Sequence, residues 1–278
     1  MEAGLGSDRT RRILYLLLAA AIALPFFAKA VIPPVVGREA RALYEAVESV
    51  PPNKIIILSL EFEAGTIGEN LPQTRALMNH MMKSGKRFAI MGFDPMGPVF
   101  GQREAEDLAK RWNRPYGQYW VNWGYKTAVV QTLKAMIRDI PGTIVADHRG
   151  TPLSKLPVMD GIKEAKDVGL IIDVTPSAIY EAWMAYFAGP GGVKMGVAPT
   201  AVMVSDIFPY LDSGQIVGML KGLAGAAQYE SLVFGRDARE RGITWMTSVS
   251  MTHILIIALI ILGNILEIAA RRRRRAAA

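Results

Sequence analysis

The sequence contains no cysteine, and only three of its 278 residues are histidine. Without cysteine the chain forms no disulfide and cannot use a thiol as a nucleophile. The histidines, His80, His148 and His253, lack the close spacing of a zinc site. The glycine-rich loops that cradle phosphates and the G-x-S-x-G turn that presents a serine nucleophile are also missing. These absences exclude thiol catalysis and remove the sequence support for nucleotide-binding loops and serine hydrolases.

The net charge of +7 comes from the ends of the chain. Nine of the 32 basic residues lie in terminal segments that hold only three acids, which leaves 23 basic and 22 acidic residues between Pro33 and Ser250. A nucleic-acid-binding face requires positive charge gathered on the folded body. The distribution therefore argues against nucleic acid as a partner.

A long apolar run near the C-terminus predicts a transmembrane helix. Residues 249–270 contain one charged residue, Glu267, and match the length of about 20 residues that crosses the hydrocarbon of a bilayer. Five arginines follow at once: Arg271, Arg272, Arg273, Arg274 and Arg275. Basic residues beside a span stay on the cytoplasmic face, so we expect these arginines to anchor the C-terminus there.

A second apolar run, residues 13–32, follows three arginines near the N-terminus. It has two interpretations. It is either a retained transmembrane helix or a secretory signal that ends in the small-x-small sequence Ala28-Lys29-Ala30. Both interpretations export the residues that follow.

These features predict a protein of the cell membrane, with the lipid bilayer as a partner, cytoplasmic termini and an extracytoplasmic main domain. The predicted segments are a cytoplasmic N-terminus (1–12), a transmembrane or signal-like helix (13–32), a linker helix (33–52), an α/β domain (53–235), a juxtamembrane segment (236–248), a transmembrane helix (249–270) and a cytoplasmic arginine-rich tail (271–278).

The middle of the chain alternates short apolar runs with amphipathic stretches. The predicted strands are 54–62, 86–93, 116–124, 143–147, 167–176 and 193–198. The predicted helices are 72–85, 102–112, 126–140, 177–187, 201–211 and 214–234. Solidly apolar strands separated by helices are typical of a parallel sheet covered on both faces. We therefore expect a three-layer, Rossmann-like α/β domain with a mostly parallel sheet.

Polar residues stand where these strands end, and in such sheets ligands bind at the carboxyl ends of the strands. The candidate ligand-binding residues are Glu61, Glu63, Asp94, Asn122, Asp147, Arg149, Asp173, Thr175 and Thr200. A ring of carboxylates suits Mg²⁺ or Ca²⁺, although no cofactor is required by the sequence. The competing interpretation is that such aspartates cap the helices that follow them.

The loop DHRGTP, residues 147–152, pairs an acid with a histidine, and Arg149 could grip a carboxylate or phosphate. An acid–histidine dyad needs a nucleophile, and the sequence provides none in a distinctive context.

Small residues recur at every fourth position in SGQIVGMLKGLAGAAQYE: Gly214, Gly218, Gly222 and Ala226. On a helix they would form one smooth stripe that permits close backbone approach, either within the domain or between subunits. Asn264, inside the second apolar run, is a further candidate for a helix–helix contact.

The segments IIILSLEFEAG, DHRGTPL, YLDSGQIVGMLKGLAGAAQYE and ILGN resemble uncharacterised prokaryotic membrane proteins that carry an exported α/β domain between two spans. The resemblance implies topology and no activity. The sequence favours a non-enzymatic, membrane-anchored subunit that binds a partner protein or small ligand and helps to assemble a larger membrane complex, through other membrane subunits or self-association. The alternative is an extracytoplasmic, metal-dependent hydrolase or transferase that uses the acidic residues at the strand ends.

Overall fold

Six parallel strands form one sheet in the order β3-β2-β1-β4-β5-β6 in a computed structural model of the chain, which describes residues 8–27 and 31–276. The strands are β1 (Ile55–Leu60), β2 (Phe88–Gly92), β3 (Trp120–Tyr125), β4 (Val168–Thr175), β5 (Lys194–Pro199) and β6 (Gly218–Met219). The chain therefore leaves β1 in one direction across the sheet and returns to β4 on its other side. In this topology the β1–β4 junction is the switch point at which α/β sheets commonly bind ligands.

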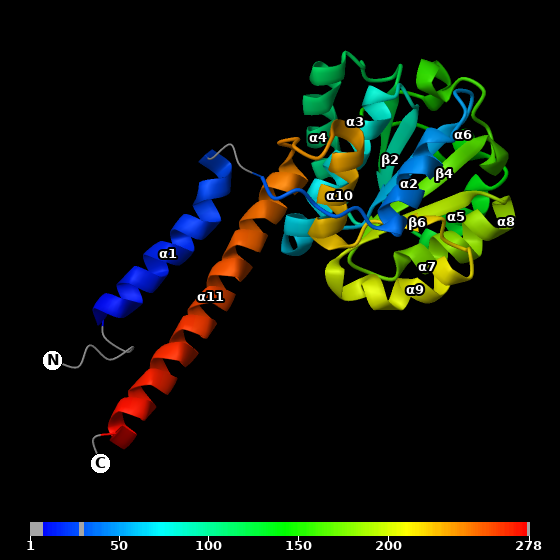
Figure 1. Ribbon diagram of the computed structural model, residues 1–278. Helices are drawn as coiled ribbons and strands as arrows, with labels where there is room; N and C mark the ends of the chain where they lie inside the picture. Colours follow the sequence, from blue (N-terminus) through cyan, green and yellow to red (C-terminus); the bar gives the residue numbers. More distant parts are fainter. Residues whose placement is uncertain (1–7, 28–30, 277–278) are drawn as a thin grey trace.

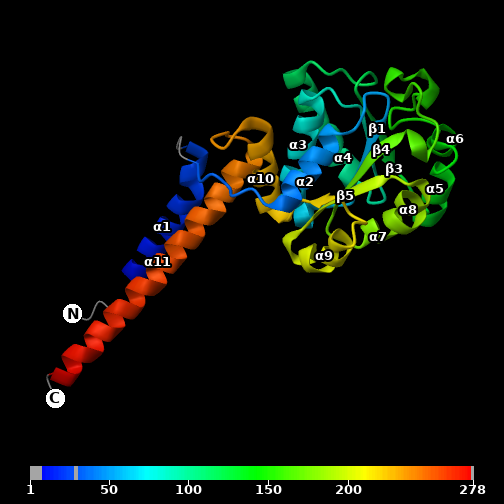
Figure 2. The same cartoon turned by 45° about the vertical axis from the view of Figure 1, so that its right-hand side comes forward.

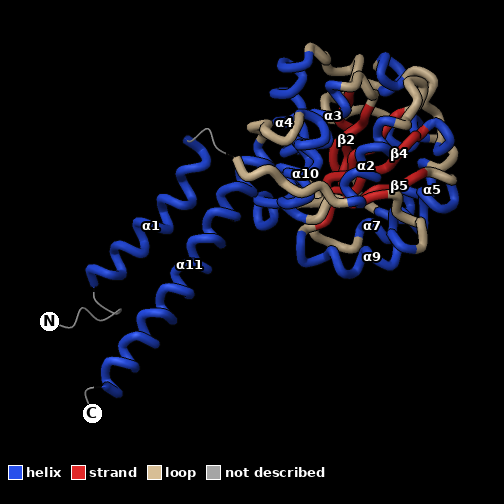
Figure 3. The backbone as a smooth tube through the Cα atoms, in the orientation of Figure 1, coloured by secondary structure: helices blue, strands red, loops and turns tan. Residues whose placement is uncertain are grey.

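Helices cover both faces of the sheet (Figures 1 and 3). One face carries α2 (Arg38–Glu48), α3 (Ile67–Lys83), α4 (Met96–Trp112) and α10 (Gly222–Phe234). The other carries α5 (Val129–Met136), α6 (Ile140–Ile144), α7 (Ile179–Trp183), α8 (Gly189–Gly191) and α9 (Val204–Asp212), with a π-helical turn at Met184–Ala188. Short 3₁₀ turns occupy Ala64–Thr66, Leu153–Lys155, Pro157–Met159, Ala165–Asp167 and Ala201–Met203.

Each face of the sheet has its own apolar core. Alternate residues of β1 point to opposite sides, so that Ile55 and Ile57 join one core while Ile56 and Leu58 join the other. All six residues of β1 are buried, as expected for a strand that is covered on both faces. The three-layer α/β prediction is thus confirmed, and the sheet is parallel throughout.

Three element predictions are wrong. The predicted helix 126–140 is divided into α5 and α6. Residues 143–147 do not form a strand, because α6 runs into this segment. The predicted helix 214–234 is a turn, the strand β6 and α10. The small-residue stripe consequently does not form: Gly214 has φ 77° in a turn, Gly218 lies in β6, and Gly222 begins α10 with φ 54°. Ala226 is buried on α10.

Two long helices lie side by side and antiparallel, away from the sheet: α1 (Asp8–Phe27) and α11 (Arg241–Ala276) (Figures 1 and 2). Both are long and apolar enough to cross a membrane, and most of their large apolar side chains are exposed. The predicted juxtamembrane segment 236–248 is mostly the first part of α11. Residues 1–7, 277–278 and the small-x-small sequence at 28–30 lie outside the described residues.

One hydrogen bond joins the two helices in addition to apolar contact, and a second joins α11 to the segment after α1. Pro25 has no N–H for the carbonyl of Ala21, and its ring crowds the preceding turn of α1. One turn earlier, the Ser248 hydroxyl on α11 donates to the Ile22 carbonyl at 2.8 Å, and Thr247 accepts the backbone N–H of Ile32 at 3.1 Å. A polar side chain on α11 thereby satisfies a carbonyl close to the proline interruption.

The junction between α11 and the domain is tightly bonded. The Glu230 carboxylate on α10 accepts the backbone N–H groups of Gly242 and Ile243, at 3.0 and 2.9 Å, and so caps the start of α11. Arg241 pairs with Glu104 of α4 at 2.6 Å. Burial raises the pKa of Glu230 to about 7, because desolvation outweighs the two backbone hydrogen bonds.

Candidate functional site

The nine residues predicted as a ligand site do not form one cluster. Glu61 and Asp173 lie together at the switch point, while Asn122, Asp147 and Arg149 form a second group beside β3. Asp94 lies next to the first group, since its backbone N–H and its charge both act on Glu61. The other three, Glu63, Thr175 and Thr200, belong to neither group.

The first group is a buried acid pair around Ser59. Ser59 of β1 stands beside Asp173 of β4 in the register of the sheet, and its hydroxyl donates to Glu61 at 2.6 Å. Trp183 donates its indole N–H to the Ser59 oxygen at 2.9 Å. The backbone N–H of Phe93 donates to both Glu61 oxygens, at 2.8 and 3.0 Å. Glu61 is therefore well held, within a wall of aromatic side chains.

Asp173 is fully buried, and neither of its carboxylate oxygens accepts a hydrogen bond from the described residues. Burial raises the pKa of Asp173 well above its ordinary value, and the nearby charge of Glu61 raises it further. Burial also raises the pKa of Glu61 to about 7, against the opposing effect of the Ser59 and Phe93 hydrogen bonds. Burial therefore favours the protonated form of both acids. Because both side chains are buried, no substrate reaches them in this conformation.

Of the remaining four residues, Asp94 has the helix-capping role that the sequence left as an alternative. Asp94 accepts the backbone N–H groups of Met96 and Gly97, at 2.8 and 3.3 Å, at the start of α4. Thr175 closes a turn with Ser177, and Glu63 is exposed. The Thr200 hydroxyl is buried without a hydrogen bond to any described residue.

A metal site at the strand ends is not formed by these side chains. Across residues 8–27 and 31–276, no three His, Asp or Glu side chains lie close enough to hold a metal ion. Glu61 and Asp173 lie together but are buried, while Asp94 and Asp147 accept backbone N–H groups of the residues that follow them.

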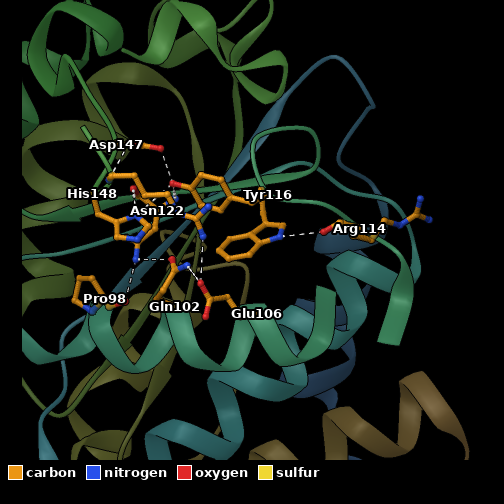
Figure 4. A network of polar contacts seen from close by, with 10 residues as sticks. Pro98, Gln102, Glu106, Arg114, Tyr116, Asn122, Asp147 and His148 are labelled. Carbon is orange, nitrogen blue, oxygen red and sulfur yellow. Dashed lines mark hydrogen bonds and ion pairs between the residues drawn. The ribbon is translucent and has the colours of Figure 1, made fainter. Parts of the chain in front are cut away.

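The second group is a polar network that joins β3 to the 147–149 loop and to α4 (Figure 4). Asn122 of β3 is buried and donates to the Pro98 carbonyl and to Gln102, at 3.0 and 3.2 Å. The Asn122 carbonyl of the backbone accepts the N–H of His148 at 2.9 Å. The loop is thus attached along the outer edge of the sheet.

The loop itself is shaped by its own hydrogen bonds. Val145 has φ 63° and ψ −61°, the conformation of a γ-turn, in which the N–H of Ala146 reaches the carbonyl of Ile144 at 2.7 Å. Asp147 then accepts the backbone N–H groups of Arg149 and Thr151, at 2.9 and 2.7 Å. A β-branched residue at positive φ is uncommon and costs free energy, which the surrounding contacts offset.

Tyr116 connects the acid and the histidine, which do not bond to each other directly. Its hydroxyl donates to Asp147 at 2.7 Å and lies 3.2 Å from His148 Nδ1. The same Nδ1 is 3.3 Å from the Asn122 backbone carbonyl, which can only accept. We therefore assign the proton of the neutral ring to Nδ1, which leaves Nε2 as the free nitrogen.

The electrostatics of this chain favour a charged Asp147 and a neutral Tyr116. Burial by itself raises the pKa of Asp147, but hydrogen bonds from Tyr116, Thr151 and Arg149 outweigh it and hold the pKa below its ordinary value. Burial, followed by the bond to Asp147, raises the pKa of Tyr116 well above its ordinary value.

A cavity of about 300 Å³ lies between α4 and β3, with His148 on its wall. Its lining residues are Pro95, Pro98, Val99, Gln102, Arg103, Asn122, Gly124, Tyr125 and His148. Of the predicted site residues only Asn122 lines it. Arg149, predicted to grip an anion, instead stacks on the Tyr116 ring at 3.7 Å and pairs with Glu106 at 3.1 Å.

Sequence reasoning did not find Arg103 or Gln102, because exposed polar residues on a helix carry no distinguishing pattern. The signal that existed was the unusual DHRGTP loop, which does border the cavity. Comparison with family models, curated proteins and solved structures finds no match for this chain, so the resemblance drawn from the sequence stays an expectation.

Proposed function

We propose that this chain is a membrane-anchored subunit whose α/β domain lies outside the cytoplasm and binds a partner protein or small ligand as part of a larger membrane complex. The observation that carries the proposal is the geometry of α11. This helix leaves the domain at Arg241, presents exposed apolar side chains from Ile254 to Ile268, and ends in arginines far from the sheet (Figure 1).

The charges support an orientation. The arginines at the start of α1 and at the end of α11 lie toward the same end of the helix pair, away from the domain (Figures 1 and 2). Positive charge beside a span favours the cytoplasmic side. The domain then occupies the opposite side of the bilayer, as the sequence predicted.

A binding role is supported by what the polar residues at the strand ends do. Glu61, Asp94 and Asp147 accept backbone N–H groups and so stabilise loops, while the cavity beside His148 remains open to a ligand. An anchor, a structured edge and an open cavity suit a receptor-like or scaffolding subunit better than a hydrolase.

The absence of cysteine makes a clean test of orientation available. We would introduce Val202→Cys in the domain, where the side chain is 81% exposed, and separately Ala276→Cys at the end of α11. A membrane-impermeant maleimide should label Val202→Cys in intact cells whose outer layers are open to it, and Ala276→Cys only after permeabilisation. The reverse pattern would refute the proposal. Native mass spectrometry of gently extracted protein then asks whether a partner or second copy accompanies the chain, and a lone monomer would argue against the assembly role.

A further inference from the structure

The cavity between α4 and β3 has a composition that points to one class of ligand. We propose that it binds a small organic acid, whose carboxylate contacts Arg103 and His148 and whose apolar body lies against Pro98, Val99 and Tyr125. The inference rests on the ligand-binding part of the proposed function and names its substrate class.

The charge on the cavity wall is positive, because Arg103 lines the cavity and no acid does. His148 contributes a ring nitrogen to the same wall. Arg103 is exposed and makes no ion pair with any residue the structure describes. Acids of α4 and of the adjoining loop are already engaged: Glu106 with Gln102 and Arg149, Asp107 with Arg75, and Asp147 with Tyr116. An incoming carboxylate therefore finds a guanidinium that no neighbouring acid has neutralised.

His148 is oriented before any ligand arrives. Its Nδ1 faces the Asn122 carbonyl and the Tyr116 hydroxyl, which fixes the ring and leaves Nε2 available on the cavity side. Nε2 donates to a ligand carboxylate only in the doubly protonated ring, and the negative Asp147, hydrogen-bonded to Tyr116, complements that form. A ring held in place by its second nitrogen loses little freedom on binding.

Shape and donors favour a carboxylic acid over phosphate. The cavity, at about 300 Å³, lies at the small end of the range for small-molecule sites. Much of its wall is apolar, with Pro95, Pro98, Val99 and Tyr125. Phosphate sites usually supply several backbone N–H groups at a helix start, but those of Met96 and Gly97 on α4 are taken by Asp94.

Benzoate is a suitable probe because it joins one carboxylate to one apolar ring. Full-length protein in a neutral detergent would be titrated with benzoate, benzyl alcohol and inorganic phosphate, and followed by saturation-transfer NMR and calorimetry. We expect benzoate to bind, and benzyl alcohol and phosphate to bind at least about tenfold more weakly, since a charge-assisted hydrogen bond contributes that much discrimination.

Two variants test the site, and one serves as a matched control. Arg103→Gln removes the guanidinium and Val99→Glu places a carboxylate in the cavity; each should weaken benzoate binding by about tenfold or more. Arg41→Gln, an exposed arginine on α2, should leave binding unchanged. Circular dichroism checks that all three remain folded.

The inference would be overturned if benzoate did not bind, or if its affinity were the same for the unchanged chain and for both cavity variants. Phosphate binding more tightly than benzoate would overturn the assignment of a carboxylic acid. Either result leaves the maleimide test of orientation untouched, so failure of this site is distinguishable from failure of the membrane-anchored subunit.

Discussion

Glu61 and Asp173 illustrate how a buried carboxyl group couples stability to pH. In the folded chain the pKa of Glu61 is about 7, whereas an unfolded glutamate titrates near 4.5. Between these values the folded state holds a proton that the unfolded state releases. The contribution to the free energy of unfolding is therefore present at low pH and is lost as pH rises through 7. The raised pKa of Asp173 acts in the same direction.

We expect Glu61→Gln to flatten this dependence, because glutamine resembles the protonated acid at every pH. Relative to the unchanged chain, the variant should gain up to about 3 kcal/mol on going from about pH 5 to about pH 8. Thermal melting across this range measures it. Glu63→Gln, an exposed glutamate two residues away, is the control and should keep the original slope. Equal slopes for the two variants would contradict the assignment.

For single residues, the sequence predicted where polar side chains lie along the strands better than it predicted which of them contact one another. Glu61 follows β1, and Asn122 and Asp173 lie within β3 and β4, as the alternation of apolar runs indicated, whereas Asp147 follows α6 and no strand. Which of them would meet depended on strand order, and short-range pattern does not encode strand order. The Ser59–Trp183 hydrogen bond joins residues 124 positions apart in sequence, and no local sequence pattern predicts it.

At the scale of helices and strands, Gly218 shows why a periodic sequence pattern can predict the wrong element. A four-residue spacing resembles a helix face, yet the requirement at this position comes from tertiary packing: a Cβ on Gly218 would stand 2.4 Å from the Leu43 backbone nitrogen of α2. The strands β1, β2 and β4, by contrast, were predicted from continuous apolar runs that need no tertiary information. β6, with two residues, is too short for any pattern to reveal.

Gly218→Ala should therefore destabilise the domain, by about 2 kcal/mol, as overpacking in a closely packed site does. Gly68→Ala on α3 is the matched control: nothing lies within 4 Å of its added Cβ. There alanine should be neutral or slightly stabilising, since it favours helix over glycine. Thermal denaturation of both variants compares them. A loss at Gly68 equal to that at Gly218 would contradict the assignment of the Gly218 effect to close packing against Leu43.

The pairing of α1 with α11 has a defined register. With Ser248 opposite Ile22, Arg12 and Arg9 of α1 fall opposite roughly residues 258–261 of α11, so α11 extends further from the domain. Because the chain lacks cysteine, a pair of introduced cysteines reports this register directly. Ala21→Cys with Ser248→Cys should cross-link on mild oxidation, and Arg12→Cys with Arg271→Cys should not. Cross-linking of the second pair alone would show that the helices slide until their basic ends are level.

For the molecule as a whole, orientation should depend on the terminal arginines. Replacing Arg271 to Arg275 by serine removes the charge that follows α11, so a fraction of the chains should insert inverted. The readout is loss of maleimide labelling at Val202→Cys in intact cells. Replacement by lysine keeps the charge and should keep the labelling. If the serine variant labels fully, the arginines near the start of α1 suffice to orient the protein.

The bonded junction between domain and helix pair has a mechanical consequence. Glu230 accepts a backbone N–H of the first turn of α11. Arg241 forms an ion pair with Glu104 of α4, and Glu240 forms one with Arg111 of the same helix. Because two neighbouring helices hold this junction, we expect it to resist bending and the domain and α11 to move as one body. If a binding partner at the β3 edge turned the domain, we would expect the tilt of α11 to change with it.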